Sequence, residues 1–319
     1  TSAGKLYTVN NPYSDLSAVM LRFETGSARD PLLCIAINLW RRAGVGEMDQ
    51  NAWEAWLYQR AVGLKASCGE ENVTLTISGP AEQLEEAIPM VEARLLEPTL
   101  DEETVKTYLV DYIARRQDNK ITADLQQSAL RKYALYGEKS SFLNSASDEM
   151  ILGTSAADYL AKVSSLHNAK RVTHYVGPRS IDEVEIELIN QENYIELEQF
   201  EPKSFVVPEQ SRILFLDFDS VQSKITVYGP DEPLNNEERP EYTLYGELMG
   251  GSAGLVFQEI REARSLAYSA SGGYRSGSEE GDQNYQWGVL ACQADKTVTA
   301  MELLVDMLHN LPDQGERWN

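Results

Sequence analysis

Residues 257–274, FQEIREARSLAYSASGGY, join a helical pattern to an alternating one with no turn signal between them. Apolar positions recur about one turn apart as far as Arg264, after which polar and apolar residues alternate as in a strand. Arg261 lies in the helical part and Tyr268 in the strand, so they meet only if the helix folds back against that strand. Spacing alone therefore favours a solvated charge at Arg261 and a half-buried aromatic side chain at Tyr268.

The same order of elements occurs twice along the chain. Extended segments, two helices, two short strands and a further helix follow one another over residues 4–96, and this order returns over residues 212–311. The first segment to return, RILFLDF at residues 212–218, has the composition of a strand. Aligning Leu64 with Leu266, an offset of 202 residues, also brings the preceding helices into register. Such a repeat indicates an internal duplication and outweighs any single motif.

The repeat divides the chain into three segments. Residues 1–190 form a first domain, and an acidic stretch followed by proline-bearing sequence makes residues 191–212 a linker. Residues 213–319 form a second domain that lacks any counterpart of residues 99–190. We therefore expect the second copy to be incomplete and the natural protein to continue. Strands and helices mix in both copies, which predicts an α/β (α+β) fold.

The charge of the chain narrows the classes of partner. It holds 50 acidic and 28 basic residues, for a net charge of −22. Phosphate backbones and anionic membrane surfaces would be repelled, so neither nucleic acid nor a membrane is an expected partner. The charge can serve solubility or attract basic peptides, and solubility is the simpler interpretation. The longest apolar run, PLLCIAINLW, is too short for a membrane span. We expect a soluble protein, cytoplasmic or bacterial periplasmic.

The cysteines predict no cross-link. Cys34, Cys68 and Cys292 are an odd number with no close pair, which argues against a disulfide framework and against a cysteine-based zinc site. The sequence therefore predicts three thiols in hydrophobic cores.

Residues 250–268 resemble the C-terminal-domain signature of the pitrilysin/insulinase family of zinc peptidases. The family pattern GG…S…F-x-E-[IL]-R-E-x-x-x-L-[GA]-Y supplies an arginine and, seven positions later, a tyrosine, which fall here at Arg261 and Tyr268. Residues 81–103 and 171–184 also resemble the family's first domain in pattern. The resemblance implies tandem pitrilysin-like domains, each a mixed, mostly antiparallel sheet covered by helices.

The resemblance also implies a division of labour between two halves that enclose a peptide. One half binds Zn²⁺ through an H-x-x-E-H helix, whose glutamate acts as general base. The other half supplies the arginine and the tyrosine, which here are Arg261 and Tyr268. The hydroxyl and the guanidinium would hold the oxyanion that develops when the peptide carbonyl is attacked, and would anchor the peptide backbone. Tyr274, Gly272 and Gly273 would line the same cleft, although the glycines fit a bulge or close packing equally well.

The zinc motif itself is missing from this chain. It would fall near residues 34–44, CIAINLWRRAG, which contain neither histidine nor glutamate. The three histidines are His167, His174 and His309; none lies within four residues of another, and each is expected to be structural or solvated. The chain thus corresponds to the zinc-less half of such a peptidase, with zinc bound only by an H-x-x-E-H-bearing partner half. The alternatives are an inactive scaffold or assembly subunit and a stand-alone peptide-binding protein.

Overall fold

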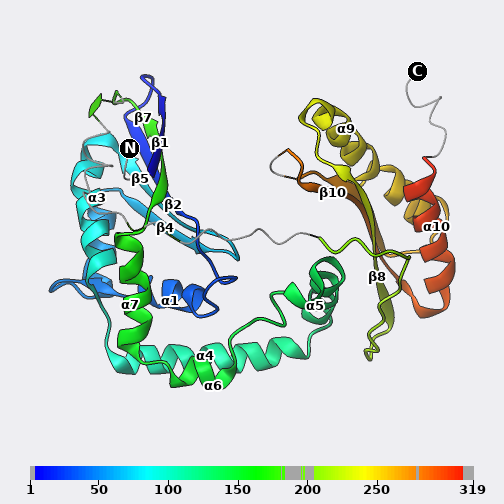
Figure 1. The fold of residues 1–319 in the computed structure, drawn as a ribbon, viewed down its shortest axis with the longest axis horizontal. Coiled ribbons are helices and arrows are strands. Elements are labelled where there is room, and N and C mark those ends of the chain that lie inside the picture. The colour runs from blue at the N-terminus through cyan, green and yellow to red at the C-terminus, as the bar shows by residue number, and fades with distance from the viewer. Residues whose placement is uncertain are drawn as a thin grey trace. The chain divides into compact units, whose positions relative to one another are not determined.

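The computed structural model describes residues 4–180, 182–183, 195, 197, 205–277 and 280–311. They fall into two compact units (Figure 1): unit 1 lies within residues 1–119 and 141–202, and unit 2 within residues 120–140 and 203–319. Helix α5 (Ala123–Tyr136) therefore belongs to unit 2, although it lies inside the segment 1–190 that the sequence assigns to the first domain.

Unit 1 is built on a sheet of five strands. They are β1 (Gly4–Asn10), β2 (Leu16–Phe23), β4 (Gly63–Cys68), β5 (Val73–Pro80) and β7 (Arg171–Gly177). Their order is β1-β7-β2-β5-β4, and only β1 and β7 run parallel. Alternate residues of the two central strands are fully buried, as expected for a sheet covered on one face: Val19, Leu21, Phe23, Val73, Leu75 and Ile77.

Helices cover that face of the sheet. They include α1 (Leu33–Trp40), α2 (Gln50–Gln59), α3 (Ala81–Leu96) and α7 (Ala156–His167), with α7 packed on α1 and α3. The core is continuous from the sheet through these helices. A two-residue ribbon of β3 (Gly44–Val45) and β6 (Pro98–Thr99) joins the end of α1 to the end of α3. Side-chain oxygens cap the first turns of α2 and α7, which sets where these helices begin.

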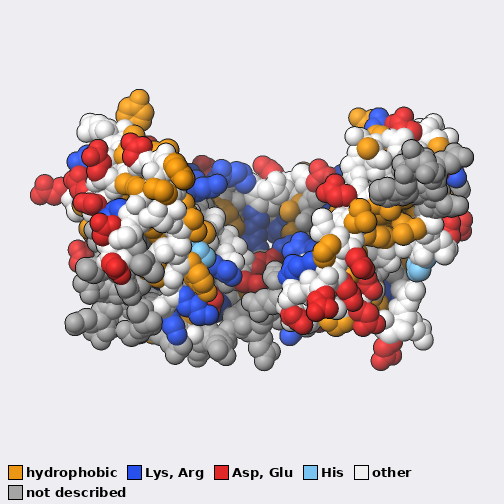
Figure 2. Space-filling view, turned by 90° about the horizontal axis from the view of Figure 1, so that it is seen from above, with side chains coloured by type: hydrophobic (Ala, Val, Ile, Leu, Met, Phe, Trp, Pro, Cys, Tyr) orange, Lys and Arg blue, Asp and Glu red, His pale blue; other side chains and the backbone are white. Residues whose placement is uncertain are grey.

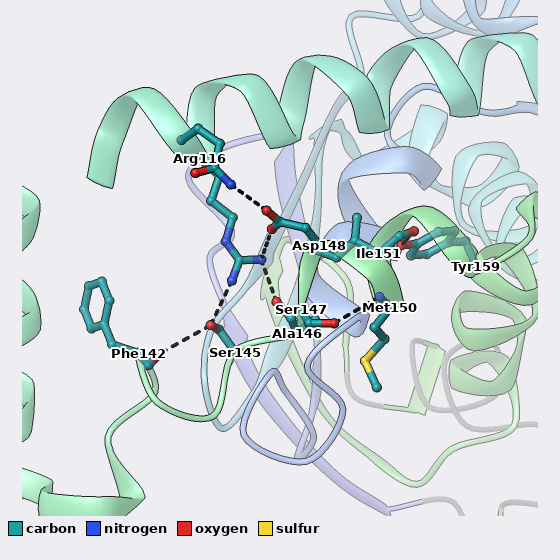
Figure 3. Close-up of polar contacts among 10 residues, drawn as sticks. Arg116, Phe142, Ser145, Ala146, Ser147, Asp148, Met150, Ile151 and Tyr159 are labelled. Carbon is teal, nitrogen blue, oxygen red and sulfur yellow. Dashed lines mark hydrogen bonds and ion pairs between the residues drawn. The ribbon is translucent and has the colours of Figure 1, made fainter. Parts of the chain in front are cut away.

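One arginine ties two further helices of unit 1 together. Arg116 of α4 (Glu102–Lys120) reaches the residues before α6 (Asp148–Gly153), as Figure 3 shows. Its guanidinium donates to the carbonyl oxygen of Ala146 at 2.6 Å and to Ser145 Oγ at 3.1 Å, and lies 3.4 Å from Asp148 Oδ1. The start of α6 is therefore fixed against α4 by several bonds to one side chain.

A second arginine is buried in the core of unit 1. Arg94 is only 2% exposed, and its guanidinium donates to the carbonyl oxygens of Trp40 at 2.8 Å and Ala43 at 2.6 Å. It also lies 4.5 Å from the ring centroid of Trp40 and 4.9 Å from that of Trp53. Burial lowers the pKa of Arg94 to about 10. Arg94 thus satisfies the free carbonyls at the end of α1.

The structure corrects the prediction for two of the three cysteines. Cys34 of α1 and Cys68 at the end of β4 form a disulfide, with Cα atoms 5.2 Å apart and a sequence separation of 34. The prediction was wrong because α1 packs over the end of β4, a tertiary contact that cysteine spacing does not reveal. Cys292 is a buried free thiol, as predicted.

Unit 2 repeats the central part of the first sheet. Its three strands are β8 (Gln222–Pro233), β9 (Ser269–Arg275) and β10 (Gln283–Gln293), in the antiparallel order β8-β10-β9. Helices α9 (Arg239–Met249) and α10 (Thr297–His309) pack on one face together with a π-helix, η3 (Phe257–Ala263). On α5, Arg131 Nε donates to the hydroxyl of Tyr228 at 2.8 Å.

Strand pairing and one equivalent turn relate the two copies in sequence. Leu21 of β2 pairs with β5, which pairs in turn with Ala66 of β4. In unit 2, Ile225 of β8 pairs with β10, which pairs with Ala270 of β9. The paired residues of β2 and β4 are 45 positions apart, as are those of β8 and β9, so the relative register is the same in both copies. The left-handed residues Ala61 and Ser265, which precede β4 and β9, set the offset at 204 residues. The order β2-β5-β4 thus recurs as β8-β10-β9, and the predicted mixed α/β fold class is confirmed.

Residues 212–218 do not form the strand that their composition predicts. They precede β8 as β1 precedes β2, and β1 pairs only with β7. Within the described part of unit 2, no strand occupies the place of β7, so residues 212–218 have no strand to pair with. In the part of the chain that the structure describes, no helix is long and apolar enough to cross a membrane.

Candidate functional site

Arg261 lies on the π-helix η3. The wider turn of a π-helix is rare in proteins, but where it occurs it is often at a functional site. The helix ends where the amide of Ser265 donates to the carbonyl of Arg261 at 2.9 Å and the amide of Leu266 donates to that of Ile260 at 2.9 Å. Ser265 has φ of 50°, a left-handed conformation that is uncommon for a residue other than glycine. This turn reverses the chain and leads it into β9.

Unit 1 contains the same turn without the wider helix. Ala61 has φ of 52°, and the amide after it donates to the carbonyl of Leu57 at 3.0 Å. Leu57 precedes Ala61 by four residues, whereas Ile260 precedes Ser265 by five, so the second copy has one extra residue. The π-helix accommodates that residue. The amide of Ala61 donates to the carbonyl of Tyr58 as that of Ser265 donates to the carbonyl of Arg261, so Tyr58 corresponds to Arg261. Leu64 lies three residues after Ala61, as Tyr268 lies three residues after Ser265, so Leu64 corresponds to Tyr268. The first copy therefore lacks the pair.

The structure brings Arg261 and Tyr268 together. The guanidinium carbon of Arg261 lies 5.9 Å from the ring centroid of Tyr268, within the range of a cation–π contact. Tyr268 is 73% exposed, and its amide is fixed by donation to the carbonyl of Ala291 at 2.8 Å. The backbone of Tyr268 is thus held by β10, while its phenol lies in solvent beside a cation.

Sequence reasoning missed a third member of this group. Phe257 lies one helical turn before Arg261, and the guanidinium carbon is 4.7 Å from its ring centroid. The spacing of four residues on a helix could have indicated the contact. Glu262 Oε1 lies 3.7 Å from Arg261 Nε, an exposed ion pair of small energetic weight. The side chain of Arg261 is thus held between two rings with its charge accessible.

Tyr274 lies at a distance from this pair. Its hydroxyl donates to Asp231 Oδ2 at 2.7 Å, and its ring is stacked on that of Tyr242 with centroids 4.7 Å apart. Burial, and then the hydrogen bond to the Asp231 carboxylate, raise the pKa of Tyr274. It lies six positions after Tyr268 along extended chain, a span of about 20 Å. The structure therefore places Tyr274 in a separate cluster with α9.

Gly272 and Gly273 allow close packing on both faces of β9. A Cβ atom on Gly272 would lie 2.8 Å from Cγ2 of Val256, the residue before η3. A Cβ atom on Gly273 would lie 2.8 Å from the ring of Trp287. Gly272 therefore lets the helix that carries Arg261 lie against β9, and Gly273 accepts the neighbouring indole.

The residues at the expected position of the zinc motif do not fit a metal. Helix α1 there is LCIAINLW, with mostly buried apolar side chains. His174 is stacked on Tyr7, and Nδ1 of His309 lies 2.8 Å from the carbonyl oxygen of Val305. His167 lies 3.7 Å from Glu92. Among the residues that the structure describes, no group of three His, Cys, Asp or Glu side chains could hold a metal ion.

Known proteins of two kinds resemble this chain. Residues 182–316 match the family model of the peptidase M16 inactive domain. The solved structure of a peptidase M16 inactive domain from Pseudomonas fluorescens superposes with a TM-score of 0.79 at 17% identity, covering 99% of this chain and 79% of that one. No curated protein sequence matches the chain.

Parts of two proteases have the same fold as well. The periplasmic protease PqqL from Escherichia coli has a TM-score of 0.76 at 15% identity and 99% coverage of this chain. The ferredoxin protease FusC, solved in complex with Arabidopsis ferredoxin, has a TM-score of 0.79 at 11% identity and 98% coverage of this chain. The chain spans only 36% of the length of each. Residues 182–316 thus match a peptidase M16 inactive domain, and the chain as a whole has the fold of a solved structure of such a domain.

Proposed function

We propose that this chain is the non-catalytic half of a zinc metalloendopeptidase that hydrolyses peptides. In this proposal, Arg261 and Tyr268 bind the substrate and stabilise the oxyanion, and an H-x-x-E-H-bearing partner half supplies the zinc. The observation that carries the proposal is the contact between the two side chains, since the guanidinium lies 5.9 Å from the exposed phenol ring. The match to an M16 inactive domain supports the same reading.

The two side chains have the chemistry that the role requires. When a peptide carbonyl is attacked, negative charge develops on its oxygen, and donors fixed in advance lower the energy of that state. The Tyr268 hydroxyl can donate one hydrogen bond, and the Arg261 guanidinium can donate further bonds to the oxygen or to the peptide backbone. The bound metal of the partner half would supply the activated water.

The surrounding structure keeps the pair in position. The Phe257 ring lies against the guanidinium of Arg261, and the left-handed turn at Ser265 aims the chain into β9. Close packing at Gly272 holds η3 on the strand. Donors fixed before substrate arrives are the condition for electrostatic stabilisation of a transition state, so these contacts support the proposed role. In this proposal Gly272, Gly273 and Tyr274 shape the wall of the cleft and make no bond to the reacting carbonyl.

The proposal is tested with the chain and an H-x-x-E-H-bearing M16 half. The chain alone is expected to bind no stoichiometric zinc and to cleave no peptide. With the partner half, Tyr268→Phe should lower kcat about 100-fold or more, because one oxyanion donor is lost. Tyr58→Phe is the matched control, since Tyr58 is 87% exposed and lies at the equivalent turn of unit 1. Full activity in Tyr268→Phe would refute the role.

A second candidate function is an inactive scaffold or assembly subunit. The matched family model is described as inactive, which favours this alternative as much as a supporting role. The same assay separates the two. A scaffold would bind its partner equally well whether residue 261 is arginine or methionine, and Arg261→Met would leave the partner's kcat and KM unchanged.

A further inference from the structure

The residue that reverses the chain between η3 and β9 is bonded through both of its backbone polar groups. Ser265 has the left-handed conformation, and its amide donates to the carbonyl of Arg261 at 2.9 Å. Its own carbonyl accepts a hydrogen bond from Nζ of Lys296 at 3.1 Å. A left-handed residue other than glycine persists only where its surroundings hold it. Lys296 is therefore one of the groups that hold this turn.

Lys296 makes this bond and no ion pair. Asp and Glu side chains are spread over the face of the protein in Figure 2, in keeping with the net charge of −22. Acidic groups are therefore the partners that a surface lysine would be expected to find. In the part of the chain that the structure describes, however, the ammonium of Lys296 has one hydrogen-bond partner, the Ser265 carbonyl, and no carboxylate within ion-pair distance.

The place of Lys296 in the chain is unfavourable for a cation. It ends η4 (Ala294–Lys296), the short turn after β10, and stands directly before α10. The start of a helix favours acidic and hydroxyl side chains, because its free amides carry partial positive charge. Lys296 makes no capping bond, and the first turn of α10 has no acidic residue. Such conflicts with local preference are expected at functional or strained sites.

The copy without the Arg–Tyr pair has no lysine at this place. Strand β9 corresponds to β4 at the offset of 204 residues. In the ladders that these two strands form, Leu290 of β10 takes the place of Leu75 of β5, which is an offset of 215 residues. Lys296 then corresponds to Ala81, the first residue of α3, whose methyl group cannot donate a hydrogen bond.

The equivalent turn of unit 1 is supported by backbone instead. A Cβ atom on Gly79 would lie 2.9 Å from the carbonyl oxygen of Ala61, so the end of β5 packs directly against that turn. In unit 2 the bond from the lysine supports the turn. The second copy thus differs from the first at three linked positions, where Arg261, Tyr268 and Lys296 replace Tyr58, Leu64 and Ala81.

We propose that Lys296 is a positioning residue, whose ammonium fixes the turn at Ser265 and so holds Tyr268 beside Arg261. This inference rests on the proposed function, because it assigns Lys296 a part in the step that the pair assists. Ser265 precedes Tyr268 by three residues, so a rotation of the turn displaces the phenol relative to the guanidinium. A displacement of about 1 Å at a catalytic group can cost up to about 100-fold in rate.

The kinetic test uses the chain together with an H-x-x-E-H-bearing M16 half. Lys296→Met removes the charge and should lower kcat about tenfold while changing KM less than about twofold, because the Tyr268 hydroxyl acts in the transition state. Lys296→Arg restores a cation and should recover most of kcat. Lys139→Met, at an exposed lysine of unit 2, is the charge-matched control and should leave kcat unchanged.

A double variant shows whether Lys296 acts through Tyr268. The hydroxyl is already absent in Tyr268→Phe, so adding Lys296→Met to that variant should lower kcat by less than about twofold. An equal loss in both backgrounds would assign Lys296 an effect of its own and overturn the positioning role.

A measurement on the chain alone separates this inference from the proposed function. The ring signals of isotope-labelled tyrosine are recorded by NMR, and the signal of Tyr268 is assigned by its loss in Tyr268→Phe. Lys296→Met should shift that signal, Lys296→Arg should shift it less, and Lys139→Met should leave it in place. Removal of a cation from the start of α10 relieves an unfavourable charge, so Tm should fall by no more than about 2 °C in Lys296→Met.

Three results would overturn the inference. They are unchanged kcat in Lys296→Met, an unmoved Tyr268 signal in that variant, and an arginine variant as impaired as the methionine one. If Tyr268→Phe is instead fully active while the Tyr268 signal moves in Lys296→Met, the proposed function fails. The turn would then still be positioned by Lys296, but without a catalytic use.

Discussion

Reduction or removal of the Cys34–Cys68 disulfide should destabilise unit 1 strongly. The cross-link joins residues separated by 34 positions, and it ties α1 to the end of β4. In the chain-entropy relation, closing a loop of this length in the unfolded state is worth about 4 kcal/mol. Both cysteines are only half-buried, so little is added by a cavity. For a unit of this size, such a loss corresponds to a fall in Tm of about 10 °C.

The assay is urea and thermal unfolding of three samples. They are the oxidised protein, the same protein in a reducing agent, and the double variant Cys34→Ala/Cys68→Ala under oxidising conditions. The reduced protein and the variant should lose stability equally, and the reducing agent should leave the variant unaffected. Cys292→Ala serves as the control for the third cysteine, which is free.

A thiol count checks the premise directly. A thiol reagent should detect one thiol, that of Cys292, in the denatured and unreduced protein. It should detect three thiols after reduction. Three thiols before reduction, or a change in Tm below about 2 °C, would refute the reasoning. Because disulfides persist mainly in oxidising environments, a single free thiol in the unreduced protein would favour an oxidising compartment.

Two further predictions concern buried polar groups. Arg94→Met should cost about 3 kcal/mol of unfolding free energy in urea, because the carbonyls of Trp40 and Ala43 lose their donor in the core; a loss below about 1 kcal/mol would contradict this. The pKa of Tyr274 is raised above its usual 10.0, so the folded state keeps a proton that the unfolded state loses as the pH rises above 10. Stability should therefore fall above pH 10, and Tyr274→Phe should make that fall smaller in urea titrations; identical slopes would contradict the hydrogen bond to Asp231.

The pattern of the sequence was sufficient for the fold class and for the repeated order of elements. Periodicity and turn signals are local, and both copies contain them in the same order. The register was less accurate, because matching Leu64 with Leu266 by identity gave an offset of 202, whereas the left-handed turns at Ala61 and Ser265 give 204. Side-chain identity does not determine register at this level of divergence, whereas the backbone conformation of the turn does.

Other features depend on contacts that sequence patterns do not contain. The disulfide joins a helix to a strand 34 residues away in sequence. The hydroxyl of Tyr274 donates a hydrogen bond to Asp231, which lies 43 residues earlier in the chain. Residues 212–218 have the composition of a strand, but a strand is stable only where a neighbouring strand provides backbone hydrogen-bond partners. The proximity of Arg261 and Tyr268 follows from the left-handed turn at Ser265, which nothing in the residue type of serine indicates.

The membership of α5 in unit 2 has a consequence for how the protein is synthesised and dissected. The chain passes from one unit to the other after residue 119, returns after residue 140 and crosses again before residue 203. During synthesis α5 leaves the ribosome long before the strands of its own unit. It can therefore pack in unit 2 only after β8 and β10 have been made, which is later than the completion of the first sheet by β7. A fragment cut at residue 190 would separate α5 from the unit in which it packs. Neither unit is therefore a single continuous segment of the polypeptide, and a fragment that keeps unit 2 intact must include residues 120–140 as well as residues 203–319.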